Sequence, residues 1–153
     1  MNRSRRRVLR LGSSVAALGA AAAAGLVPAH ADAAWNKGGF ESKAAGDAIK
    51  SLGATGAAES KDIVITAPDI AENGAVVPIA VTSRIPNTES ISIIAEKNPF
   101  PLAATFDFAQ GTEGYASVRI KMGQTSHVRA VVKAGGKFYT ASKEVKVTVG
   151  GCG

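Results

Sequence analysis

Two segments, YASVRIKM (residues 115–122) and HVRAVVK (residues 127–133), decide the fold of this chain. Apolar side chains take every second position in both: Ala116, Val118, Ile120 and Met122 in the first, and Val128, Ala130 and Val132 in the second. A period of two is typical of a strand with one face buried and the other in water. The sequence therefore predicts two successive amphipathic strands, with His127, Arg129, Val131 and Lys133 on the wet face of the second.

The pattern continues to the end of the chain. Gly135-Gly136, between Lys133 and Lys137, is a signal for a tight hairpin turn. Strands are predicted beyond it over 138–141 and 144–149. In the last of these, Val145, Val147 and Val149 face one way.

Towards the N-terminus, shorter strands are expected at the ranges 62–66, 76–82, 90–96 and 102–108. Pro78 has no N–H to give to a neighbouring strand, so it indicates an edge strand or a bulge. With about seven or eight short strands, residues 57–149 are predicted to form a mainly β domain, an antiparallel immunoglobulin-like β-sandwich. A small open barrel is the alternative.

Residues 1–31 have the features of an export signal. A basic start is followed by an apolar, alanine-rich run and by Ala29-His30-Ala31, which predicts cleavage between Ala31 and Asp32. The start, SRRRVLR (residues 4–10), resembles the twin-arginine export motif, with Arg5 and Arg6 as the pair. We therefore expect a periplasmic protein that is exported already folded. A short N-terminal membrane anchor is the alternative.

Residues 32–56 are expected to be a lead-in that contains one short helix. The chain is polar and glycine-containing as far as Phe40, which predicts a flexible segment. Apolar positions recur at helical spacing from Glu41 to Leu52, and Gly53 is suited to end that helix.

Charge argues against a nucleic-acid-binding protein. The chain has 18 basic and 12 acidic residues, but five of the basic ones lie within residues 1–31 and none of the acidic ones does. The remainder carries 13 basic and 12 acidic residues, so it is close to neutral. Its lysines are scattered, and a basic groove would need them clustered.

The single cysteine is the most informative residue. Cys152 stands in the tail Gly150-Gly151-Cys152-Gly153, where glycines confer wide backbone freedom and no side-chain bulk. We expect a flexible arm whose thiol enters the active sites of other proteins. An incidental free thiol and a disulfide to another chain are the alternatives, because one cysteine cannot form a disulfide within its own chain.

Other chemistry finds little support in the sequence. No metal site and no cofactor are predicted, and no motif of a hydrolase, metalloprotease or nucleotide-binding loop is present. His127 is interpreted as a surface residue, and Asp62, Asp69 and Glu72 as solvated loop charges. The di-glycine ends of ubiquitin-like sulfur carriers offer a second carrier chemistry, but those chains end in a glycine carboxylate.

Three stretches together resemble the SoxY family of bacterial thiosulfate oxidation. They are the ending VGGCG (residues 149–153), the run APDIAENGAVVP (residues 67–78) and the run VRIKMGQT (residues 118–125). The resemblance spans nearly the whole chain after the signal. The chain ends after one glycine where the family often has two.

The resemblance implies that Cys152 carries sulfur intermediates covalently, so that the protein is a carrier and not an enzyme by itself. It further implies a heterodimer with SoxZ. The haem enzyme SoxAX would join thiosulfate to the cysteine and the hydrolase SoxB would release sulfate. Where a sulfane dehydrogenase, SoxCD, is present, it would oxidise the persulfide that is left. No resident cofactor is implied for the carrier.

Two other functions stay open on the residues alone. One is a non-catalytic, periplasmic, immunoglobulin-like interaction module with an incidental free thiol, and the other is a thiol-dependent enzyme acting alone. The surface for SoxZ is not specified by the sequence. The strand with Ile91, Ile93 and Ile94 is a candidate, because it is unusually apolar for a wet face.

Overall fold

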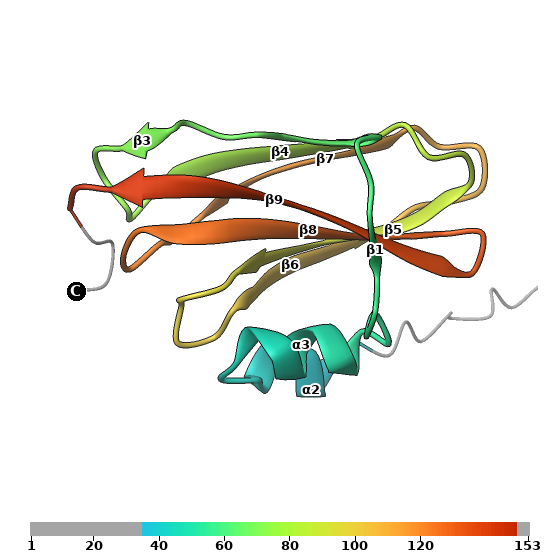
Figure 1. The fold of residues 1–153 in the computed structure, drawn as a ribbon, viewed down its shortest axis with the longest axis horizontal. Coiled ribbons are helices and arrows are strands. Elements are labelled where there is room, and N and C mark those ends of the chain that lie inside the picture. The colour runs from blue at the N-terminus through green and yellow to red at the C-terminus, as the bar shows by residue number, and fades with distance from the viewer. Residues whose placement is uncertain (1–34, 150–153) are drawn as a thin grey trace, which may run out of the picture. The chain divides into compact units, whose positions relative to one another are not determined.

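Nine strands in two sheets, with two short helices, form the described part of the chain, residues 35–149 of a computed structural model (Figure 1). The strands are β1 (Ala58–Glu59), β2 (Ile63–Thr66), β3 (Ile70–Ala71), β4 (Val77–Ser83), β5 (Thr88–Ala95), β6 (Leu102–Asp107), β7 (Gly114–Ile120), β8 (Ser126–Ala134) and β9 (Lys137–Val147). The larger sheet has the order β1-β9-β8-β5-β6, with β3 also paired to β9. The smaller sheet has the order β2-β4-β7.

The two sheets enclose the main core, which confirms the predicted mainly β sandwich. Their inward positions hold small and branched apolar side chains, among them Val77, Ile79, Val81, Ile91, Ile93, Ala116, Ile120, Met122, Val128, Ala130, Val132 and Val145. The alternation seen in the sequence is therefore the alternation of burial along β7, β8 and the end of β9. Because the strands form two separate sheets, the barrel alternative is wrong.

The strand pairs are antiparallel with two exceptions, and both involve β9. β1 and β3 each pair with it in parallel, through Glu59 opposite Thr140 and Ala71 opposite Val147. Both strands have two residues, and neither was predicted from the sequence. The two strands expected over 138–141 and 144–149 are one continuous strand, β9.

Pro78 lies in β4, the middle strand of the smaller sheet, and not in an edge strand. β2 pairs with β4 only from Ala80 to Ser83, whereas β7 pairs with it over its whole length. At Pro78 the strand therefore has a single neighbour. The local environment is that of an edge, which explains why a residue without an N–H is tolerated there.

The turn Gly135-Gly136 joins β8 to β9 as predicted. Both glycines have positive φ, 56° and 72°, and the flanking residues Ala134 and Lys137 pair with each other. Two positive φ values in a two-residue loop are the geometry of a type I′ turn, whose twist matches that of the strands.

Two helices, α2 (Lys37–Glu41) and α3 (Ala45–Ser51), cover the outer face of the larger sheet (Figure 1). The single helix predicted from Glu41 to Leu52 is thus shorter, and the segment expected to be flexible up to Phe40 contains α2. The Asn36 side chain accepts a hydrogen bond from the Gly39 N–H at 2.9 Å and donates one to the Ser51 carbonyl at 3.0 Å. It therefore caps α2 and ties it to α3.

Close packing explains the glycine in α2. A Cβ atom at Gly39 would lie 2.7 Å from the Ser51 hydroxyl and 2.9 Å from a Leu102 methyl group. α3 ends as predicted at Gly53, where φ is +75°. The Gly53 N–H bonds the Lys50 carbonyl and the Ala54 N–H bonds the Ile49 carbonyl, which is the Schellman arrangement.

The helices create a second core on the outer face of the sheet. It contains Ala48, Ala54, Ile94, Leu102 and Val131, all buried. Val131, predicted to face water, is therefore covered. The proposal that Ile91, Ile93 and Ile94 form a partner surface is wrong, because none of them is exposed. Ile94 faces the helices while its neighbour Ile93 stays in the main core, because successive side chains of a strand point to opposite faces of the sheet.

Candidate functional site at the root of the C-terminal tail

The residues predicted to do the chemistry, Cys152 with Gly150, Gly151 and Gly153, lie outside the described residues. The twin-arginine pair Arg5 and Arg6 and the cleavage site at Ala31 and Asp32 lie outside them as well. The structure does describe the chain that leads to the cysteine. Residues 146–149, here called the tail root, end three positions before it.

The tail root is held by residues 69–74, here called the holding segment. The Lys146 N–H donates to the Asp69 carbonyl at 2.9 Å, and the Thr148 N–H donates to the Ala71 carbonyl at 3.1 Å. The Gly74 N–H donates to the Val149 carbonyl at 2.8 Å. The two segments thus pair in parallel up to the last described residue (Figure 1).

A side chain adds to these main-chain bonds. The Thr148 hydroxyl donates to the Glu72 carbonyl at 3.0 Å. The Asn73 side chain accepts from the Ala75 N–H at 2.8 Å, which forms a local turn beside Gly74. This turn presents the Gly74 N–H to the tail root.

The loop after β7 also forms hydrogen bonds with the holding segment and the tail root. The Met122 N–H donates to the Gly74 carbonyl at 2.7 Å, and the Thr125 hydroxyl accepts from the Val147 N–H at 3.0 Å. Met122 is fully buried in the main core. Gly74 is consequently bonded on both sides, to Met122 and to Val149, so the core and the tail root are two hydrogen bonds apart.

An ion pair fixes the start of the holding segment. The Lys143 ammonium lies 3.0 Å from the Asp69 carboxylate and donates to the Ala67 carbonyl at 2.7 Å. The Asp69 side chain is largely in solvent, with 88% of its surface exposed. A pair this exposed stabilises the fold by at most about 1 kcal/mol, so its role is chiefly to position residues 67–69 against β9.

The role of Asp69 and Glu72 in holding the tail root was not predicted from the sequence. Asp69 and Glu72 are exposed, as predicted. It is their carbonyl groups that hold the tail root. Every residue has a main-chain carbonyl whatever its side chain is. The residue types therefore could not show that these carbonyl groups bind the tail root. The available signal was the motif over residues 67–78, which was recognised only as a resemblance.

Exposed apolar side chains lie on the tail root and in or next to the holding segment. Val149, Ile70 and Val76 expose 63%, 57% and 55% of their surface. Ile70 belongs to β3, while Val76 joins the holding segment to β4. Their neighbours Ala71 and Val77 point into the main core. Ile70 and Val76 are thus apolar at positions that face water, where polar side chains would be well solvated.

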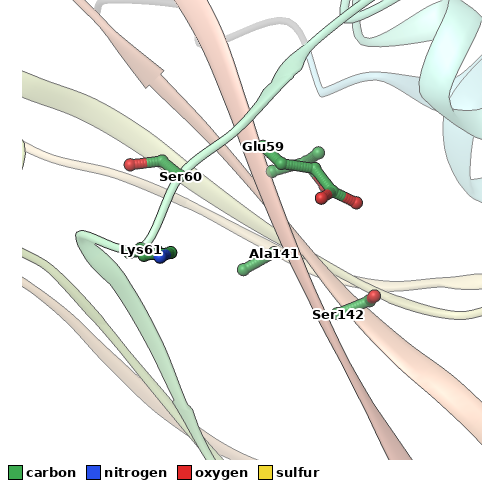
Figure 2. Close-up of a pocket in the computed structure, with 6 residues that line it drawn as sticks. Glu59, Ser60, Lys61, Ala141 and Ser142 are labelled. Carbon is green, nitrogen blue, oxygen red and sulfur yellow. The ribbon is translucent and has the colours of Figure 1, made fainter.

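Hollows are present elsewhere on the described surface. One, of about 300 Å³, lies where β1 leaves the edge of β9 and is lined by Glu59, Ser60, Lys61, Thr140, Ala141 and Ser142 (Figure 2). Another, of about 450 Å³, lies beside Asn87 and Gly111. Neither contains a residue of the tail root or of the holding segment.

No metal centre is found within residues 35–149. Those residues contain no group of three histidine, cysteine or acidic side chains that could hold an ion. His127 is exposed, as predicted. Within the same residues, no helix is both long enough and apolar enough to cross a membrane.

Comparisons with known proteins agree with this geometry. A family model described as "Sulfur oxidation protein SoxY" matches residues 49–152. Among solved structures, the sulfur carrier protein SoxY from Chlorobium limicola f thiosulfatophilum is similar, with 41% sequence identity and a TM-score of 0.62. That match covers 71% of this chain and 95% of the other. No curated protein sequence matches the chain.

A weaker likeness concerns the fold alone. The superoxide reductase (neelaredoxin) from Ignicoccus hospitalis has 22% identity and a TM-score of 0.51, over 61% of this chain and 89% of the other. A variant of that reductase has 20% identity and a TM-score of 0.50, over 69% and 90%. This sandwich therefore occurs in proteins of different chemistry, so the fold does not by itself select a function.

Proposed function

The chain belongs to the SoxY family, and we propose that it is a carrier that holds sulfur intermediates covalently on the thiol of Cys152. The observation that carries the proposal is the position of this cysteine. It stands three residues beyond Val149, whose carbonyl is bonded by Gly74. A reactive thiol at the end of the chain thus follows directly upon a well-held base.

The chemistry requires a thiolate that other proteins can reach. In the first step the Cys152 sulfur bonds to the outer sulfur of thiosulfate, which releases the thiol proton and gives two electrons to a haem enzyme. The product is an S-thiosulfonate. Hydrolysis of its bond to the sulfonate group consumes water, releases sulfate and leaves a persulfide on the carrier. Serine cannot replace the cysteine, because both steps proceed through the sulfur.

A carrier explains why the sequence on both sides of Cys152 consists of glycines and not of catalytic residues. Successive enzymes need the same sulfur in their own active sites, and covalent attachment keeps a reactive persulfide from being lost. Tethering also raises the effective concentration of the intermediate at each enzyme. The proposal therefore needs no general base or metal from this chain.

The partners and compartment belong to the same proposal. We expect a stable heterodimer with SoxZ and transient contacts with SoxAX and SoxB, and with SoxCD where that enzyme is present. The twin-arginine motif at Arg5 and Arg6 supports export to the periplasm. SoxZ would cross in the same folded complex.

Mass analysis of the C-terminal peptide tests the carrier role. Protein purified from thiosulfate-grown cells should carry additions of one sulfur atom, or of one sulfur plus SO₃, on the peptide that contains Cys152. The Cys152→Ser variant should lack both and should abolish thiosulfate oxidation. Unmodified peptide together with an active Cys152→Ser strain would refute the proposal.

Deletion of residues 150–153 separates the carrier from the interaction module with an incidental thiol. The deletion leaves every described residue in place, so a module that acts through the sandwich should keep its function. A carrier should lose all sulfur transfer while still binding SoxZ.

A further inference from the structure

The distance between Val149 and Cys152 limits where a partner enzyme can stand. Three residues separate the two positions. Even fully extended, they cannot place the Cα atom of Cys152 more than about 11 Å from that of Val149, at about 3.3–3.6 Å per residue. An enzyme that takes the thiol into its active site must therefore bring the mouth of that site close to Val149.

The chain cannot easily detach from the sandwich at Val149 to lengthen the tail. Releasing Val149 and Thr148 from the sandwich would break the bonds from Gly74, to Ala71 and to Glu72. Gly74 is in turn bonded to the buried Met122. The enzyme thus meets the surface around the tail root in its folded form.

That surface is apolar at its centre. Seven large hydrophobic residues are exposed within the described chain. Three of them lie here: Val149 in the tail root, Ile70 in the holding segment and Val76 two positions after that segment. All three stand at the end of the sandwich where β9 finishes and β4 begins (Figure 1). Glu72, Asn73 and Lys146 are exposed polar residues close to them in sequence, and the exposed Lys121 precedes Met122, whose N–H bonds the Gly74 carbonyl.

An apolar centre with polar surroundings is the composition of a protein-binding site. The fold itself gives no reason for it. Ile70 points away from the core, opposite Lys146 in the pairing of β3 with β9. Polar side chains would serve equally well at this position if only water covered it.

We propose that Ile70, Val76 and Val149 form a docking surface for the enzymes that act on the Cys152 thiol. This inference rests on the proposed carrier function and deepens it. The occupant is an enzyme with an apolar mouth and a reaction centre within about 11 Å of it. The area is small, so the contact is weak and transient. This contact strengthens the association of the two proteins and leaves the reactivity of the sulfur unchanged.

The test uses carrier loaded without any enzyme. Tetrathionate reacts with the Cys152 thiolate to give the S-thiosulfonate and to release thiosulfate, a thiol exchange that needs no added oxidant. The loaded heterodimer is then offered to the hydrolase that releases sulfate, and the rate is measured against carrier concentration. Loading by the small anion serves as the measure of thiol access, since it requires no docking.

The variant is Ile70→Ser, Val76→Ser and Val149→Ser combined, and the matched control is Tyr115→Ser. Tyr115 exposes a similar 52% of its surface and lies at the opposite end of β7 from the tail root. We expect kcat/KM for sulfate release to fall at least tenfold in the triple variant, mainly through KM. The loading rate should stay unchanged, and the control should behave as wild type.

A longer tail provides a second test that leaves the sandwich untouched. Four glycines inserted between Gly150 and Gly151 add about 13 Å of reach, so the enzyme no longer has to approach the docking surface closely. In this background the triple substitution should lower kcat/KM less than threefold. If the triple variant folds poorly, Val149→Ser alone replaces it in both tails, because this side chain is 63% exposed. It should lower kcat/KM in the natural tail, and the insertion should reduce that loss.

The outcomes separate the two proposals. Equal kcat/KM for the wild type and a folded triple variant overturns the docking surface and leaves the carrier function standing. Loss of SoxZ from the triple variant also overturns it, because the three residues would then belong to the permanent interface. Loaded wild-type carrier that releases no sulfate overturns both.

Discussion

The two ends of β9 are held in different ways. At its start, the strand leaves a two-residue turn whose glycines already have the required positive φ. The Glu89 carboxylate adds a hydrogen bond from the Gly136 N–H at 2.9 Å and an ion pair with Lys133 at 2.8 Å. At its end, the strand is held by a segment 76 residues away in the sequence, through the bond from Thr148 to Glu72.

The difference shows which end serves the function. The start of β9 is a hairpin turn between neighbouring residues, and Glu89 adds one hydrogen bond to it from 47 residues away. The end of β9 forms only when the holding segment, the loop after β7 and the main core are all in place. In the proposed function, the tail that presents its cysteine to several enzymes thus emerges from the better-connected end. Four substitutions test this contrast, from the largest expected effect to the smallest.

Met122→Ala should have the largest effect, because it removes a fully buried side chain from the residue that bonds Gly74. We expect the free energy of unfolding to fall by about 2–5 kcal/mol. Urea denaturation measures it, and hydrogen exchange should show faster exchange of the Gly74 amide. Met122→Leu keeps the volume and should cost less than about 1.5 kcal/mol. Equal stability of the two variants would contradict the proposed link to the core.

Gly136→Ala tests the start of β9. Its φ of +72° is unfavourable for a residue with a Cβ atom, although there is open space around it, so we expect a loss of about 1–2 kcal/mol. Gly46→Ala is the control, since Gly46 lies in α3 and also has open space. That change should stabilise the protein by about 0.5–1 kcal/mol. Thermal unfolding of both variants checks the signs, and the Gly74 amide should exchange as in the wild type.

Thr148→Val removes the hydroxyl that bonds the Glu72 carbonyl and keeps the shape of the side chain. The bond is exposed, so we expect a loss of no more than about 1 kcal/mol. Hydrogen exchange at the tail root should nevertheless speed up, whereas Thr148→Ser should behave as wild type. Unchanged hydrogen exchange in the valine variant would show that the main-chain hydrogen bonds alone are enough to hold the tail root.

Glu89→Gln should have the smallest effect. The hydrogen-bonded Lys133 ammonium and then the Gly136 N–H hold the pKa of the Glu89 carboxyl below its ordinary value of 4.5. A lowered pKa in the folded state means that the charged form contributes stability above about pH 4.5, and that this contribution is lost as the pH falls through the lowered pKa. The wild type and the variant should therefore differ slightly at neutral pH and converge in acid. Added salt should reduce the difference, because the pair is exposed.

Much of the sandwich could be predicted because its signals are local. The alternation in residues 115–133 and the Gly135-Gly136 turn each depend on a few neighbouring residues. The helices were predicted less well. They cover Ile94 and Val131, which lie far from them in the sequence. A period-two pattern shows that these side chains face away from the main core, but it does not show which segment packs against them.

By itself, the sequence determined the sandwich, the turn and the place of the thiol near the chain's end, and its motifs pointed to the family. Only the tertiary structure decided what holds the base of the tail and which apolar residues lie beside it. The physical reason is that residues 69–74 act through main-chain N–H and carbonyl groups. Every residue but proline has both groups, so their pairing depends on which segments the core brings together and not on which side chains they bear.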